Sequence, residues 1–125
     1  MILDTNAVSA LLGGDQNIAE VLAFEPQHHL PTVVIGEYRY GLTRSSQQAR
    51  LGSMFDLLIP RSIVLPIDLD TTVHYARIRH ELRQKGRPIP ENDLWIAALA
   101  SQHSQRIVSR DLHFDGVAGI HRVVW

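Results

Sequence analysis

The sequence contains no cysteine among its 125 residues. That absence excludes disulfides, thiolate zinc sites and cysteine nucleophiles. The longest apolar run covers residues 94–100 (LWIAALA), well short of the ~18 residues that a membrane-spanning helix requires. Asp4 and Asp15 interrupt the N-terminal segment, which therefore lacks the basic and then apolar pattern of a secretion signal. We expect a cytoplasmic protein with no membrane segment.

Lysine is almost absent as well. Of the twelve basic side chains, eleven are arginine and only Lys85 is lysine. Arginine binds phosphate and carboxylate groups through two parallel N–H donors, which lysine cannot do. A GC-rich genome would produce the same bias, and the formal net charge of -1 argues neither for nor against an anionic partner.

Length and hydrophobic periodicity favour one α/β domain, over residues 1–125. Short apolar runs predict strands at residues 1–3, 29–32, 62–67, 106–109 and 122–125. Apolar residues at helical spacing, with capping and stop signals, predict helices at residues 5–12, 15–24, 33–43, 47–58, 68–85 and 91–103. Asp68 or Asp70 caps the fifth of these helices, and Glu91 or Asn92 begins the sixth.

Strands that alternate with helices are typical of a parallel sheet covered on both faces. The sequence therefore predicts an α/β fold with three layers, α/β/α, and a central, mainly parallel sheet of four to five strands covered by helices. In such sheets, ligands bind at the carboxyl ends of the strands, near the point where the strand order reverses. Asp4 follows the first predicted strand directly and would lie at such an end.

Four of the thirteen acidic residues are not readily explained as helix caps or as solvated side chains. Asp4 follows the first strand, and Asp111 follows the fourth by two residues. Glu37 stands among apolar and aromatic residues, and Asp93 lies in the first turn of the most apolar helix. Taken singly, three of them have a specific ordinary alternative: a favourable helix dipole for Asp93, a turn for Asp111, and an ion pair with Arg39 or Arg44 for Glu37.

Taken together, these acids indicate a metal site. Four carboxylates gathered at one edge of a sheet cannot all remain ionised unless a cation balances their charge. Oxygen ligands without cysteine suit a hard divalent ion, Mg²⁺ or Mn²⁺, and such ions assist phosphodiester cleavage. Small polar side chains that could orient the carboxylates stand beside them: Thr5, Asn6, Asn92 and Ser109. An N-cap role is an equally good interpretation of Asn92.

Four segments, in this order and spacing, resemble the PIN-domain ribonucleases: LDTN, IGEYRYG, IPENDLWIAALA and VSRDLHF. Residues 75–100 are especially similar to the VapC-type toxins of prokaryotic toxin–antitoxin pairs. The resemblance covers essentially the whole chain. No single motif is specific, but the set of four is.

The resemblance implies a PIN-like fold and an acidic metal site formed by Asp4, Glu37, Asp93 and Asp111. Asp4 and Asp93 would bind Mg²⁺ directly, with Mn²⁺ as a substitute. Ser109 matches the small hydroxyl residue that precedes the last acid in the family. Asp115 is a further candidate acid for the site, ranked below Asp111. The implied function is endonucleolytic cleavage of single-stranded RNA by a toxin that pairs with a VapB-type antitoxin and forms a homodimer.

Other α/β proteins of this size explain fewer residues. A phosphotransfer receiver domain requires an acidic pair after the first strand and a lysine after a late strand, and neither is present. An aspartyl phosphatase requires a second acid where Asn6 stands. A PIN fold that only binds or regulates, without catalysis, stays open as an alternative, although all four acids are present.

Two further groups of residues have ordinary interpretations. Five basic residues between Arg77 and Arg87 could contact RNA or an antitoxin, but a solvated helix face is favoured. The seven histidines lack the i, i+4 pairing of a helical zinc site. His113 is the one nearest the acids, and we expect it to pack in the core beside Phe114.

Overall fold

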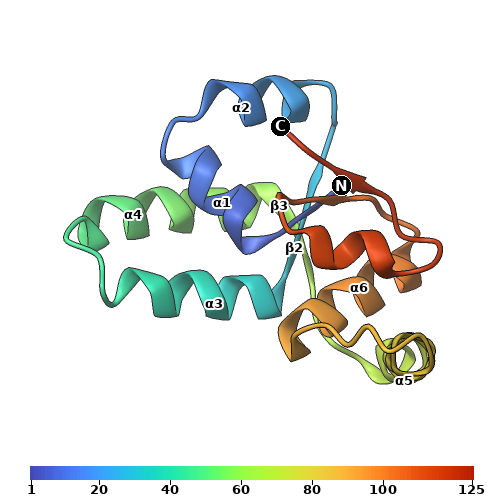
Figure 1. Cartoon of the computed structure of the whole chain (residues 1–125). Helices are drawn as coiled ribbons and strands as arrows, with labels where there is room; N and C mark the ends of the chain where they lie inside the picture. Colours follow the sequence, from blue (N-terminus) through green and yellow to red (C-terminus); the bar gives the residue numbers. More distant parts are fainter.

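Five short strands and six α-helices alternate along the chain, and the computed structural model describes all 125 residues (Figure 1). The strands are β1 (Ile2–Leu3), β2 (His28–Pro31), β3 (Ser62–Leu65), β4 (Ile107–Val108) and β5 (Arg122–Val123). The helices are α1 (Thr5–Leu12), α2 (Gln16–Ala23), α3 (Thr32–Leu42), α4 (Gln48–Leu58), α5 (Leu69–Gln84) and α6 (Glu91–His103). Two 3-10 turns are η1 (Ile59–Arg61) and η2 (Leu112–Gly116).

All five strands belong to one parallel sheet in the order β3-β2-β1-β4-β5, which confirms the predicted sheet. In the central strand β1, Ile2 pairs with His29 on one side and with Ile107 on the other. The chain moves outward from β1 to β2 and β3, and then returns to β4 on the opposite side of β1. The strand order therefore reverses between β1 and β4, where sheets of this kind bind ligands.

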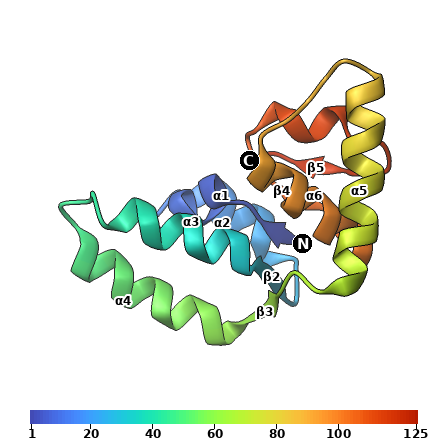
Figure 2. The same cartoon turned by 90° about the horizontal axis from the view of Figure 1, so that it is seen from below.

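Helices cover both faces of the sheet, as the sequence predicts (Figure 2). Helices α1 to α4 connect β1, β2 and β3 on one side, while α5 and α6 connect β3 to β4 on the other (Figures 1 and 2). Right-handed crossover connections produce this arrangement, because the direction of travel across the sheet changes after β3. The result is a three-layer α/β/α fold.

The central strands are buried on both faces. Ile2 and Leu3 of β1 and Ile107 and Val108 of β4 have no exposed surface. A sheet covered by helices on both sides requires apolar residues throughout its strands rather than in alternation. This burial fixes the ends of β1 and β4, and so fixes the residues that follow them.

Helix α5 shows how the local sequence sets a helix boundary. The carboxylate of Asp68 accepts a hydrogen bond from the backbone N–H of Thr71 (3.1 Å), whose hydroxyl bonds back to Asp68, so Asp68 rather than Asp70 is the cap. The helix ends before Gly86, whose φ of 66° is left-handed. None of the helices combines the length and apolar character needed to cross a bilayer.

Three local predictions differ from the structure. Strand β3 ends at Leu65 because the next residue, Pro66, has no N–H to donate to the sheet. Helix α6 begins after Pro90 without a side-chain cap, so the N-cap role considered for Asn92 is wrong. The turn η2 was not predicted, because five residues give too short a pattern to show helical periodicity.

Candidate active site

Asp4 lies at the switch point of the sheet because it follows β1 directly and its backbone N–H donates to Val108 of the neighbouring strand (3.2 Å). It is also the N-cap of α1, where one carboxylate oxygen accepts a hydrogen bond from the N–H of Thr5 (2.7 Å). Only 4% of the residue is exposed. The first strand thus delivers a buried carboxylate to the carboxyl edge of the sheet.

Ser109 joins Asp4 to the far end of the chain. Its hydroxyl, which is fully buried, donates to Asp4 Oδ2 (2.6 Å) and accepts from the N–H of Asp111 (2.9 Å). The amide of Asn6 donates to Asp4 Oδ2 (3.0 Å) and to the Ser109 hydroxyl (3.2 Å). Two predicted small polar residues therefore fix the orientation of the Asp4 carboxylate.

Glu37 reaches the same edge from α3. Its two carboxylate oxygens accept hydrogen bonds from the hydroxyl of Thr5 and from the side-chain amide of Asn92. Because Thr5 also contacts Asp4 and Asn92 precedes Asp93, these bonds connect Glu37 to both. The alternative that Glu37 pairs with a nearby arginine is wrong.

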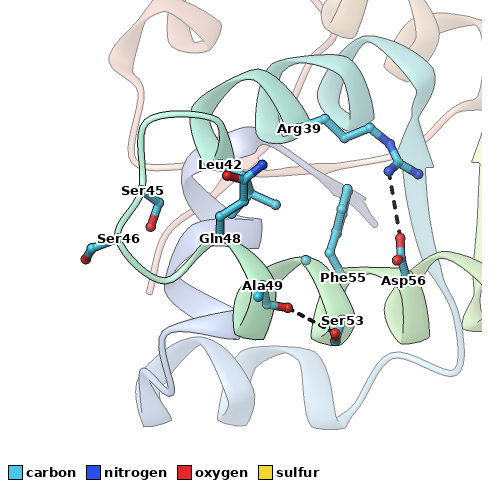
Figure 3. Close-up of a pocket in the computed structure, with 10 residues that line it drawn as sticks. Arg39, Leu42, Ser45, Ser46, Gln48, Ala49, Ser53, Phe55 and Asp56 are labelled. Atoms are coloured by element: carbon cyan, nitrogen blue, oxygen red, sulfur yellow. Dashed lines mark hydrogen bonds and ion pairs between the residues drawn. The ribbon is translucent and has the colours of Figure 1, made fainter.

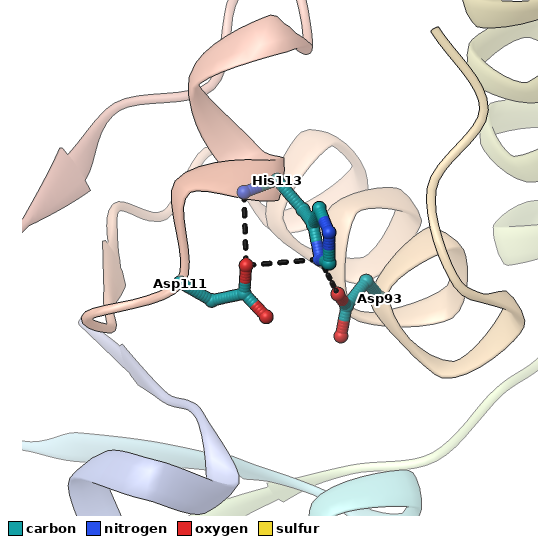
Figure 4. Close-up of side chains that lie close together, drawn as sticks. All are labelled: Asp93, Asp111 and His113. Carbon is teal, nitrogen blue, oxygen red and sulfur yellow. Dashed lines mark hydrogen bonds and ion pairs between the residues drawn. The ribbon is translucent and has the colours of Figure 1, made fainter.

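Asp93 and Asp111 meet at the open side of the site (Figure 4). Asp93 projects from the first turn of α6, and Asp111 follows β4 and caps η2 by accepting the N–H of His113 (2.9 Å). The Nδ1 atom of His113 lies 3.0 Å from Asp93 Oδ2 and 2.9 Å from Asp111 Oδ1. One ligand atom from each of these three residues falls within 4.8 Å of the other two.

His113 faces the acids at the surface and does not pack in the core, so the expectation from the sequence is wrong. Its side chain is 48% exposed, whereas the neighbouring Phe114 is the residue that fills the core, with no exposed surface. The short turn η2 directs the two side chains in different directions. A signal existed in VSRDLHF, since a histidine two residues after an acid, next to a buried aromatic, can face the same site as that acid.

The carboxylates repel one another, and the pKa values record this. Burial raises the pKa of Asp93 from 3.8 to about 6, with contributions from the charges of Asp111 and Asp4. Burial also raises the pKa of Asp4, although the hydrogen bond from Ser109 opposes the shift. The hydrogen bond to Asp93 raises the pKa of His113. The site therefore favours added positive charge.

These residues fit a divalent cation. The donors are carboxylate oxygens and one imidazole nitrogen. The buried carboxylate of Asp4 is held in one orientation by neutral hydrogen-bond donors, the side chains of Asn6 and Ser109. Carboxylates suit Mg²⁺ and Mn²⁺, and imidazole suits transition ions. The raised pKa values of Asp4 and Asp93 give a physical reason for binding, since a cation removes the cost of ionising them together.

Asp115, the further acid, is held elsewhere. Both of its oxygens accept hydrogen bonds from the guanidinium of Arg122 (2.8 Å each), which lowers the pKa of Asp115. The same guanidinium donates to the carbonyl of Ser109 (3.1 Å). Asp115 thus contacts the backbone behind the site through Arg122 and does not join the four acids.

Two of the five basic residues between Arg77 and Arg87 make contacts within the protein. Arg77 pairs with Glu81 (3.4 Å) and donates to Ser101 (2.8 Å). Arg79 pairs with Glu91 (3.4 Å) and lies over the ring of Tyr75. These contacts support the interpretation of a solvated helix face.

A groove of about 480 Å³ begins at the site. It runs from Thr5 and Glu37 between α1, α3 and α4 to Arg50. A larger cavity of about 720 Å³ lies farther out, between α3 and α4, where Arg39 and Asp56 form an ion pair (3.7 Å; Figure 3). Only the smaller groove contains one of the four acids, so it is the one that can guide a substrate to them.

Comparisons with known proteins show the family to which the chain belongs. The family model for the PIN domain matches residues 1–120. Ribonuclease VapC5 from Mycobacterium tuberculosis is 33% identical, over 95% of this chain and 90% of its own length. The VapC ribonuclease Y4jK from Sinorhizobium fredii is 30% identical, over 96% of this chain and 93% of its own length.

Solved structures give the same result. The DNA-bound VapBC complex from Salmonella typhimurium contains a chain that is 27% identical and superposes with a TM-score of 0.89, over 99% of this chain and 96% of that one. The structure of VapBC2 from Rickettsia felis, bound to a promoter DNA fragment, contains a chain that is 26% identical. It superposes with a TM-score of 0.85, over 99% of this chain and 97% of that one.

Proposed function

Because this chain belongs to the PIN domain family and to its VapC ribonucleases, we propose that it is a metal-dependent endoribonuclease, the toxin of a toxin–antitoxin pair. The substrate would be single-stranded RNA. The observation that carries the proposal is the chain of contacts linking Glu37, Asp4, Asp111 and Asp93 at the switch point. The whole of residues 1–125 would form one catalytic domain, since β5 beyond the matched segment completes the sheet.

Asp4 and Asp93 would hold Mg²⁺, or Mn²⁺ in its place. When bound, such an ion activates water and neutralises the charge that develops on the phosphodiester. Glu37 and Asp111 would orient the hydrated ion or accept the proton of the attacking water. The neutral donors Thr5, Asn6, Asn92 and Ser109 keep these carboxylates in place.

The partners proposed follow from the relatives. The superposed structures are of VapBC from Salmonella typhimurium and VapBC2 from Rickettsia felis, and we propose that this chain binds a VapB-type antitoxin. A homodimer and a cytoplasmic location are also proposed. The groove between Glu37 and Arg50 would receive RNA, and the guanidinium of Arg50, which donates to Gln47 in this structure, would bind phosphate instead.

An RNA-cleavage assay with Mg²⁺ or Mn²⁺ tests the proposal. We expect Asp4→Asn and Asp93→Asn to lose more than the roughly 100-fold that removal of a supporting contact costs. Asp70→Asn, a change at an exposed acid of α5, is the matched control and should cut like the wild type.

Circular dichroism must show that both site variants are folded. Cleavage by either folded variant at the wild-type rate would contradict the metal-site assignment. Wild-type cleavage that persists in EDTA would contradict the metal dependence. A folded wild-type chain that binds RNA and antitoxin but cuts no RNA would favour the alternative of a binding module without catalysis.

A further inference from the structure

The Asp93, Asp111 and His113 cluster differs from an all-carboxylate site by one nitrogen atom. His113 Nδ1 is the ring atom that faces both carboxylates, and the ring points between them from η2 (Figure 4). From this geometry we infer that His113 is a nitrogen ligand of the catalytic ion and makes the site prefer Mn²⁺ over Mg²⁺. The inference rests on the proposed function and deepens it.

The distances suit shared ligation. Neighbouring donors of an octahedral ion, each 2.0–2.1 Å from it, are separated from one another by roughly 3 Å. His113 Nδ1 lies 3.0 Å from Asp93 Oδ2 and 2.9 Å from Asp111 Oδ1. The three side chains therefore need little rearrangement to become adjacent ligands.

The position of His113 is fixed by its surroundings. Asp111 caps η2 through the N–H of His113 (2.9 Å), and Phe114 anchors the turn in the core. Val117 N–H closes the turn by donating to Phe114 (3.2 Å). An imidazole held in this way loses little freedom when it binds an ion, which increases its contribution to affinity.

The identity of the donor decides the preference between ions. Mg²⁺ favours oxygen ligands, usually one or two carboxylates with several waters. Imidazole nitrogen is a poorer ligand for Mg²⁺ and a better one for first-row transition ions. A neutral imidazole at position 113 also gives the site one negative charge fewer than an aspartate there would, and the lower charge weakens its hold on a hard ion.

Pulsed electron paramagnetic resonance on the full chain with one equivalent of Mn²⁺ tests the ligation directly. We expect coupling of the manganese electron spin to an imidazole ¹⁴N nucleus in the wild type. The coupling should disappear in His113→Asn. His80→Asn, which changes an exposed histidine of α5, is the matched control and should keep it.

Competitive titration of Mn²⁺ against Mg²⁺ tests the preference. We expect His113→Asp, which restores an all-oxygen site, to lower the ratio of Mn²⁺ to Mg²⁺ affinity by about tenfold. Thermal unfolding of each variant without metal checks that the fold is intact.

Two results separate this inference from the proposed function. If Mn²⁺ binds the wild type without ¹⁴N coupling, Asp93→Asn abolishes that binding and His113→Asp leaves the affinity ratio unchanged, the inference is wrong and the metal site stands. If Asp93→Asn leaves Mn²⁺ binding unchanged, the proposed metal site is wrong, and the inference is wrong with it.

Discussion

The two sides of the acidic site are built differently. On the inner side, Asp4 and Ser109 are buried, and each polar atom of their side chains has a hydrogen-bond partner in the chain. On the outer side, the side chains of Asp93, Asp111 and His113 are 13%, 31% and 48% exposed. Charge is therefore fixed in position on the inner side and accessible on the outer side.

This difference separates two tasks within one site. The inner side can hold a carboxylate in one orientation because neutral donors surround it, and such preorganisation reduces the reorganisation that a reaction requires. The outer side faces solvent, where an ion and a nucleic acid can enter. Removing a supporting group on the inner side, such as the Ser109 hydroxyl, should mainly affect stability, and changes on the outer side should mainly affect pH and ion dependence.

The largest effect is expected on the inner side, from Ser109→Ala. This change removes a donor to Asp4 and an acceptor for the N–H of Asp111, all within a buried region. We expect a loss of about 3 kcal/mol in the free energy of unfolding, measured by urea denaturation. Ser53→Ala, at an exposed helix position, is the control and should stay within about 0.5 kcal/mol.

A loss below about 1 kcal/mol for Ser109→Ala would mean that the hydroxyl does not anchor Asp4, and the comparison of the two sides would fail. The Ser53 variant guards against a general effect of removing hydroxyls.

The second effect is a pH dependence set by the outer side. The pKa of Asp93, raised to about 6, means that the folded state binds a proton more tightly than the unfolded state, so stability falls as the pH rises through this range. The raised pKa values of Asp4 and His113 act in the same direction. His28, His29 and the N-terminal amine have lowered pKa values and act in the opposite direction. Without metal, we therefore expect the wild type to lose about 1 kcal/mol more stability than Asp93→Asn between about pH 5 and pH 8.

Urea denaturation at the two pH values measures this loss. Asp93→Asn should reduce it, and Mn²⁺ added at the higher pH should reverse it, because the ion binds only the folded state. Asp15, Asp68 and Asp115 have lowered pKa values and lose their stabilising effect only below about pH 4, outside this range. A wild-type loss no larger than that of Asp93→Asn would contradict the prediction.

The third effect concerns the hydrogen bond by which Asn92, next to Asp93, holds the carboxylate of Glu37. Asn92 lies on the exposed surface of α6, and its amide donates to Glu37. Asn92→Ala should slow RNA cleavage about tenfold by freeing the Glu37 carboxylate, since supporting contacts of this kind contribute 10-fold to 100-fold. Stability should change by less than about 0.5 kcal/mol. Unchanged cleavage would show that Glu37 does not require this contact.

The smallest effect is expected from Asp115→Asn. Asp115 is half exposed and pairs with Arg122, and exposed ion pairs contribute roughly 0–1 kcal/mol. Because Asp115 does not contact the four acids, cleavage should continue at the wild-type rate. A loss as large as that of Asp93→Asn would place Asp115 in the active site after all.

Most of the fold could be predicted from the sequence, for identifiable reasons. The helix at residues 5–12 was correctly bounded because Asp4 caps it and Gly13 ends it. The strands were found because helix-covered sheets require apolar runs, such as Ile107 and Val108. The start of α6 at Glu91 was also predicted, but the capping role considered for Asn92 was not confirmed, because Pro90 supports the helix N-terminus through its fixed backbone angle rather than through a side-chain hydrogen bond.

The site was harder to predict than the fold. The positions of Asp4 and Asp111 followed from strand ends, which local sequence reveals. The role of His113 depended on which way η2 turns its side chains, and the partner of Glu37 depended on how α3 packs near α6. Both are tertiary facts, and only the first has a local signal, the histidine two residues after Asp111 in VSRDLHF. The sequence contained the residues, and the packing determined which of them meet.

The adjacency of β1 and β4 in the sheet has a consequence for the timing of biosynthesis. The hydrogen bond between Asp4 and Ser109 spans 105 positions of the chain. When a ribosome has translated α5, Asp4 has already been synthesised, but β4 and Ser109, which anchor its carboxylate, have not. The carboxylates can assemble only when nearly the whole message has been read, so an incomplete nascent chain has no such site.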